Sequence, residues 1–100
     1  MVRVSHPEER KSWTQRFLSS LRAEEPSFRA GRGGGVSENF DVAVRWDEAT
    51  DEARAIVDLR TPVPSAPRKK VVELRFDSRE DPRQAAAAVV LVGKKRAFGV

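Results

Sequence analysis

The chain has 100 residues, 39% of them hydrophobic and 34% charged, a composition that supports one domain with its own core. It contains no cysteine, which excludes disulfides, thiolate metal sites and cysteine catalysis. No apolar run approaches the roughly 20 residues that span a bilayer. The first six residues lack the apolar core of a signal peptide. We therefore expect a soluble, cytoplasmic protein with no membrane partner.

Positive charge is concentrated in the second half of the chain. The formal net charge is +4. Residues 1–50 are electrically balanced, so the excess lies in residues 51–100, where two clusters stand out: Arg68-Lys69-Lys70 and Lys94-Lys95-Arg96. Together with a pI near 10.1, this clustering is typical of proteins that bind nucleic acids. A charge of this size is also ordinary on a small soluble domain.

Residues 6–24 have the pattern of an amphipathic helix. Its apolar side consists of Trp13, Phe17, Leu18 and Leu21. Pro26 disfavours helical backbone at Glu25, so the helix is expected to stop there. Four glycines within residues 31–35 then predict a flexible connector over residues 31–37.

Three later segments alternate between apolar and polar residues, as half-buried strands do. They are residues 40–46, 54–60 and 70–77. An acidic loop at 47–53 joins the first two, and a stiff proline-rich loop at 61–68 joins the last two. That loop contains Pro64-Ser65-Ala66-Pro67, which resembles the proline motifs bound by sorting domains and SH3-type modules. The polar alternate positions indicate an antiparallel meander with one face in water.

A second helix is expected to begin with Asp81 as its cap and Pro82 as its first residue. Residues 85–88 are all alanine and favour a helix. The following β-branched residues also suit a strand, so residues 89–100 are either the end of this helix or a hairpin turning at Gly93.

The sequence therefore predicts a single α+β domain in the order α-β-β-β-α, with a three-stranded meander packed on two helices. The expected one-sided core consists of Trp13, Phe17, Leu21, Phe40, Val42, Val44, Val57, Leu59, Val72, Leu74 and Phe76.

Residues suited to catalysis or metal binding are scarce, and we expect no enzyme, no catalytic residues, no metal and no cofactor. His6 is the only histidine, and tyrosine is absent. The carboxylates at 47–52 lack the spacing of a calcium loop. The glycines at 31–35 lack the spacing of a dinucleotide-binding fingerprint, although Arg29 and Arg32 beside them are suited to phosphate contacts.

The predicted element order is similar to that of double-stranded RNA-binding domains and of the small Alu-binding subunits of the signal recognition particle. Residues 81–88 resemble the alanine-rich second helix of the first family. Arg79-Glu80-Asp81 stands where that family places a lysine pair. The resemblance implies an RNA-binding fold and carries over no site residue.

Two functions follow as hypotheses. In the first, the chain binds nucleic acid, RNA in preference to DNA, by basic contacts to the phosphate backbone. The predicted site residues are Arg45, Arg54, Arg60, Arg68, Lys69, Lys70, Arg75, Lys94, Lys95 and Arg96. In the second, the chain is a protein-interaction or assembly module that pairs through an open sheet edge, with another protein or with itself as a homodimer.

Overall fold

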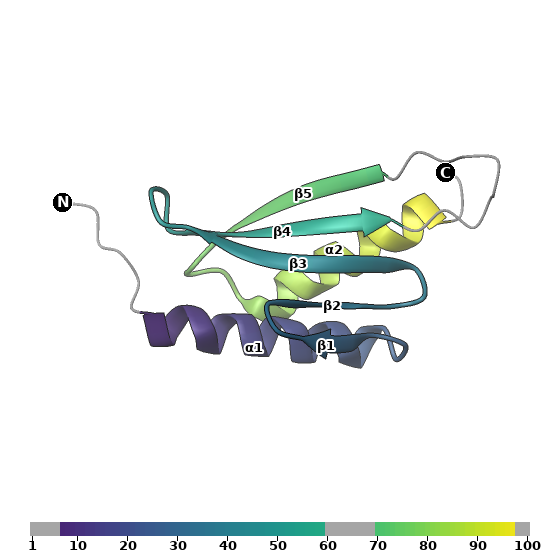
Figure 1. Cartoon of the computed structure of the whole chain (residues 1–100), viewed down its shortest axis with the longest axis horizontal. Helices are drawn as coiled ribbons and strands as arrows, with labels where there is room; N and C mark the ends of the chain where they lie inside the picture. Colours follow the sequence, from purple (N-terminus) through teal and green to yellow (C-terminus); the bar gives the residue numbers. More distant parts are fainter. Residues whose placement is uncertain (1–6, 60–69, 98–100) are drawn as a thin grey trace.

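The computed structural model describes residues 7–59 and 70–97, and it has two helices and a five-stranded antiparallel sheet (Figure 1). The elements in chain order are α1 (Pro7–Glu24), β1 (Arg29–Gly31), β2 (Gly34–Val36), β3 (Phe40–Asp47), β4 (Glu52–Leu59), β5 (Lys70–Asp77) and α2 (Pro82–Ala97). The predicted α+β class and single-domain fold are confirmed. The strand order β1-β2-β3-β4-β5 follows the chain without a crossover.

Helix α1 forms at the predicted place because its apolar residues recur at helical spacing. Trp13, Phe17, Leu18 and Leu21 are its buried residues. The helix ends at Glu24, two residues before Pro26, as predicted. The Glu25 amide still donates to the Leu21 carbonyl at 2.8 Å, which closes the last turn.

The expected connector at 31–37 is wrong, because β1 and β2 form a hairpin there. The two strands pair antiparallel, and β2 also pairs with β3. Gly33 has a φ of +74° and supplies the turn, a conformation that glycine adopts without strain. At Gly35 a Cβ would lie 2.5 Å from the Arg29 carbonyl and against the Phe28 ring. Glycine here allows close packing of the backbone against an aromatic ring.

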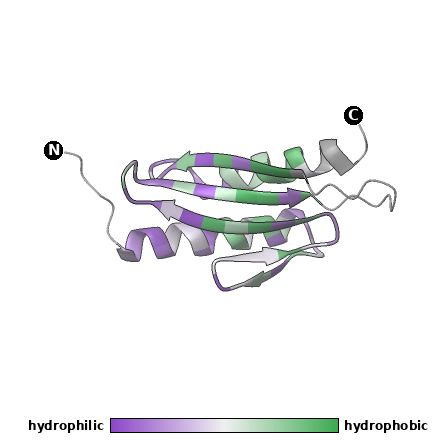
Figure 2. Ribbon diagram, turned by 45° about the horizontal axis from the view of Figure 1, so that its top comes forward, coloured by the Kyte–Doolittle hydropathy of each residue, from purple (hydrophilic) through white to green (hydrophobic). Residues whose placement is uncertain are grey.

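Strands β3, β4 and β5 form the predicted meander, each with eight residues. The turn between β3 and β4 is shorter than predicted, since Asp47 and Glu52 are already paired across the two strands. Buried and less buried residues alternate along most of β3 and throughout β4. Each of the three strands carries both apolar and polar residues (Figure 2). The predicted proline-rich loop at 61–68, with Pro64–Pro67, lies outside the described residues.

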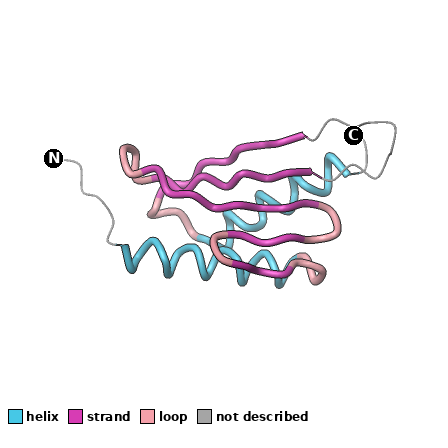
Figure 3. The backbone as a smooth tube through the Cα atoms, in the orientation of Figure 1, coloured by secondary structure: helices cyan, strands magenta, loops and turns pink. Residues whose placement is uncertain are grey.

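Helix α2 begins as predicted, with Asp81 Oδ1 accepting the Arg83 amide at 2.9 Å and Pro82 as its first residue. It continues to Ala97, so the alternative of a hairpin at 89–100 is wrong for the residues described. Gly93 lies inside the helix, where a Cβ would be 2.8 Å from the Phe40 ring. Both helices cover the same face of the sheet (Figure 3).

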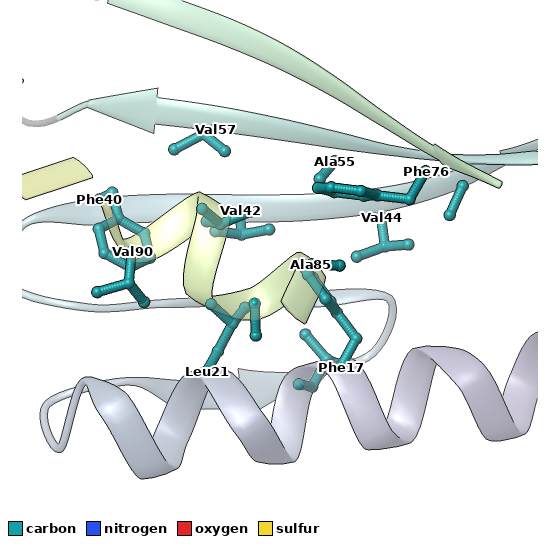
Figure 4. Packing of buried hydrophobic residues seen from close by; sticks show 14 of the residues in the cluster. Phe17, Leu21, Phe40, Val42, Val44, Ala55, Val57, Phe76, Ala85 and Val90 are labelled. Atoms are coloured by element: carbon teal, nitrogen blue, oxygen red, sulfur yellow. The ribbon is translucent and has the colours of Figure 1, made fainter. Parts of the chain in front are cut away.

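The core lies between this face and the helices (Figure 4). Nine of its predicted members are buried, whereas Val72 and Leu74 of β5 are only half-buried. The prediction omitted several buried residues: Leu18, Phe28, Ala53, Ala55, Ala85, Ala86, Val89 and Val90. The half-burial of Val72 and Leu74 leaves the core incompletely covered beneath the last strand.

Candidate functional site

The sheet face opposite the helices brings three predicted site residues into one row. Arg45 pairs with Arg54 across β3 and β4, and Arg54 pairs with Arg75 across β4 and β5. Residues directly opposite in an antiparallel sheet share a face and have Cβ atoms about 5 Å apart. We call this set the arginine row and its face the outer face.

Carboxylates bind two members of the arginine row. Arg54 donates to Oε1 of Glu73 through both Nη2 and Nε, the latter at 2.8 Å. Arg75 donates to Oε2 of Glu73 at 3.3 Å and lies 3.8 Å from Glu52. The hydrogen bond from Arg54 is the main cause that lowers the pKa of the Glu73 carboxyl below its ordinary value. Arg45 is exposed and makes no ion pair with a described residue.

Acidic side chains outnumber basic ones on the outer-face positions of β3, β4 and β5. The basic positions are the three of the arginine row, and the acidic positions are Asp41, Asp47, Glu52, Asp58, Glu73 and Asp77. Asp47, Glu52 and Asp77 form a row directly beside the arginines. A phosphate backbone that approached these three strands would therefore meet both acidic and basic side chains, several of them already in ion pairs with each other.

The other predicted site residues lie elsewhere. Lys70 is the first residue of β5, and Lys94, Lys95 and Arg96 belong to the last two turns of α2. Arg60, Arg68 and Lys69 lie outside the described residues. The arginine row is thus the only part of the predicted site that the described residues show assembled.

Strand β5 is a long open edge of the sheet. It pairs with β4 over eight consecutive residues, and no described strand lies on its other side (Figure 1). The opposite edge, β1, has only three residues. Val71 on β5 is 58% exposed, and its neighbours Val72 and Leu74 are half-buried. An edge of this kind has unpaired backbone groups beside incompletely covered apolar side chains.

A shallow depression of about 430 Å³ lies where the glycine hairpin meets the outer face. Its lining includes residues 31–36 together with Ile56, Val71, Asp41 and Asp58. Arg32, in the hairpin turn, is one of the lining residues. Because two carboxylates line it, the depression does not form the anion-binding cradle that the glycines and arginines had suggested.

A cluster around Arg10 has a structural role. Arg10 of α1 donates to Asp51 Oδ1 at 2.9 Å, Ser78 donates to Asp51 Oδ2 at 3.1 Å, and the Arg10 guanidinium lies 5.6 Å from the centre of the Trp46 ring. Arg10 and Asp51 are nearly covered, with side-chain exposures of 13% and 12%. The cluster joins α1 to the two turns that follow β3 and β5.

Residues 7–59 and 70–97 contain no group of three histidine or acidic side chains placed to hold a metal ion. His6 lies outside these ranges. Neither helix, within the residues described, is long and apolar enough to cross a membrane.

Comparison of the chain with protein-family models, curated proteins and solved structures gave no match. The element order that suggested the RNA-binding families is itself extended here, because β1 and β2 stand between α1 and the three predicted strands. The candidate site therefore rests on the geometry of this chain alone.

The three members of the arginine row were among the ten predicted site residues, whereas no residue of the β5 edge was predicted as a site residue for its apolar side chain. The sequence contained one signal of an apolar edge strand. Three aliphatic residues, Val71, Val72 and Leu74, lie within four positions of a predicted strand that has no proline. The signal was incomplete, because only the fold shows that α2 leaves the inner face of β5 partly uncovered.

Proposed function

We propose that the chain is a protein-interaction module that accepts an extended strand from another chain at the β5 edge. The observation that carries this proposal is the combination at β5 of eight residues in regular register with half-buried Val72 and Leu74. A strand added there gains backbone hydrogen bonds, and its alternate side chains cover the inner-face residues.

The length and regular pairing of β5 support this proposal. Natural edge strands commonly avoid pairing by being short, by containing proline, by forming a bulge or by carrying charged side chains. Of these devices β5 has only the last, in Lys70, Glu73, Arg75 and Asp77. β5 spans about 26 Å at the usual rise per residue, contains no proline and matches β4 without a bulge. β1 at the other edge is protected by its length of three residues.

Nucleic-acid binding through the arginine row is the second candidate function. Arg45, which has no ion-pair partner among the described residues, favours it. The carboxylates on the same face oppose it, because they repel phosphate and already neutralise Arg54 and Arg75.

One NMR experiment tests both candidates on the isotope-labelled full chain. The first titrant is a blocked peptide with the sequence of residues 70–77, and its control is the same peptide with proline in place of its valine and leucine residues. We expect the peptide, and not its control, to shift the amide signals of β5 while those of β1 stay in place. Unchanged β5 signals would contradict the proposal.

The second titrant is an RNA stem-loop at low salt. If the arginine row binds phosphate, the signals around Arg45 shift and the shifts shrink as salt is added. Shifts of this kind without any response of β5 to the peptide would replace the proposed function with the second candidate.

A further inference from the structure

We infer that the strand accepted by β5 is β5 of a second copy of this chain, paired antiparallel about a two-fold axis at Leu74. This inference rests on the proposed function and adds the identity of the partner and the register. In an antiparallel pair, residues directly opposite each other lie on the same face of the sheet. Only axes that lie midway between two copies of the same β5 residue therefore continue both faces of the sheet into the second copy, and each axis is named below by that residue.

Charge favours the axis at Leu74 over the neighbouring axes at Glu73 and Arg75. With this axis, Glu73 lies opposite Arg75 of the second copy, and the symmetry makes the contact twice. An axis at Glu73 would place two Glu73 side chains opposite each other, and an axis at Arg75 would do the same for two Arg75 side chains. Opposite charges directly across a sheet stabilise the pair, and like charges destabilise it.

Overlap excludes the axes at Val72 and Phe76. The register at Val72 pairs only residues 70–74 and sets Glu73 opposite Val71, and the register at Phe76 pairs only residues 75–77. The axis at Leu74 pairs residues 71–77 and uses seven of the eight residues of β5. It also matches the existing ion pairs, since Glu73 is held by Arg54 while its contact to its own Arg75 is long, at 3.3 Å.

The same register covers the exposed part of the core. On the inner face, Leu74 lies opposite Leu74 of the second copy, and Val72 lies opposite Phe76 of the second copy. Val72 and Leu74 are half-buried in the single chain, and Phe76 is buried beside them. The outermost pair, Val71 with Asp77, adds no attraction. The pairing therefore closes the core where α2 leaves it open.

Single cysteine variants test the register, because the chain has no cysteine of its own. In Leu74→Cys the two cysteines face each other with Cα atoms about 5 Å apart, which suits a disulfide. In the matched variant Val72→Cys they are about 13 Å apart along the strands. We expect mild oxidation to give a covalent dimer of Leu74→Cys and not of Val72→Cys. Equal crosslinking of the two variants, or crosslinking of Val72→Cys alone, would overturn the register.

Charge reversal gives a second test that does not alter the core. Glu73→Arg and Arg75→Glu each place like charges across the axis, so each alone should sediment as a monomer at a concentration where the native chain is dimeric. Mixed one to one, they should form a heterodimer, because every facing pair is then opposite in charge. Arg45→Glu makes the same charge change two strands away and should dimerise like the native chain.

The outcomes separate this inference from the proposed function. A native chain that stays monomeric at millimolar concentration, while the residue 70–77 peptide still shifts the β5 signals, overturns the second copy as partner and leaves the strand-accepting function. A chain that neither dimerises nor responds to the peptide overturns both. Failure of the two charge variants to form a heterodimer overturns the axis at Leu74.

Discussion

Asp51 shows how one residue combines local strain with a long-range contact. Its φ of 55° is the only positive value among the non-glycine residues described, and aspartate tolerates this region better than most residues. The same residue accepts hydrogen bonds from Arg10 and Ser78. The turn between β3 and β4 therefore keeps an unfavourable backbone conformation at Asp51, because the Asp51 side chain connects this turn to α1 and to the loop after β5.

Substitution of Asp51 should separate these two effects. Asp51→Ala removes the carboxylate and keeps the strain, and we expect it to lower the free energy of unfolding by about 2–4 kcal/mol. Asp51→Gly removes the strain as well, so its loss should be about 1 kcal/mol smaller. Urea denaturation measures both. Glu48→Ala, an exposed residue of the same turn, is the control and should change stability by less than about 0.5 kcal/mol. Equal losses for alanine and glycine at position 51 would show that the backbone strain is negligible.

At the scale of elements, the β1–β2 hairpin is where sequence reasoning failed. Glycines usually weaken strands, so the run at 31–35 predicted a connector. In the fold, Gly34 and Gly35 are needed because backbone and the Phe28 ring approach them too closely for a Cβ. Glycine composition alone does not distinguish a flexible segment from a closely packed one, because the packing partners come from distant elements.

The hairpin gives a matched pair of glycine variants. Gly35→Ala would press a methyl group onto Phe28 and the Arg29 carbonyl, and we expect a loss of about 1–3 kcal/mol in the free energy of unfolding. At Gly31 a Cβ meets nothing within 4 Å and φ is not positive. Gly31→Ala should therefore change stability by less than about 1 kcal/mol, in the stabilising direction if at all. Similar losses for both variants in thermal or urea unfolding would contradict this packing role of Gly35.

The other elements were predictable to different degrees. α1 and strands β3 to β5 follow directly from periodicity, and the start of α2 follows from Asp81 and Pro82. The C-terminal half of α2 was ambiguous in the sequence because β-branched residues such as Val89 and Val90 favour strands. In the fold both side chains are buried under the sheet, and this packing stabilises the helix. Burial of four alanines in the core could not be predicted from hydrophobicity alone, since it depends on how closely the backbones approach.

At the scale of the whole molecule, the sheet has one short edge and one long edge, with helices on a single face. Composition pointed to a basic phosphate-binding surface. Folding instead pairs Arg54 and Arg75 with the carboxylates of Glu52 and Glu73 on β4 and β5. Net charge is a property of the composition, whereas a binding surface depends on the register that places charges side by side. This is why the sequence alone identified the arginines and not their partners.

Hydrogen exchange of the β5 amides tests the central claim most directly. Every second amide of an edge strand points away from the sheet and exchanges rapidly unless another strand pairs with it. We expect these amides of the native chain to become protected as the protein concentration rises from about 1 μM to about 1 mM, in a range set by dimer dissociation. The outward amides of β1 should stay unprotected throughout. Outward β5 amides that exchange at the same rapid rate at both concentrations would contradict pairing of β5 with a second copy.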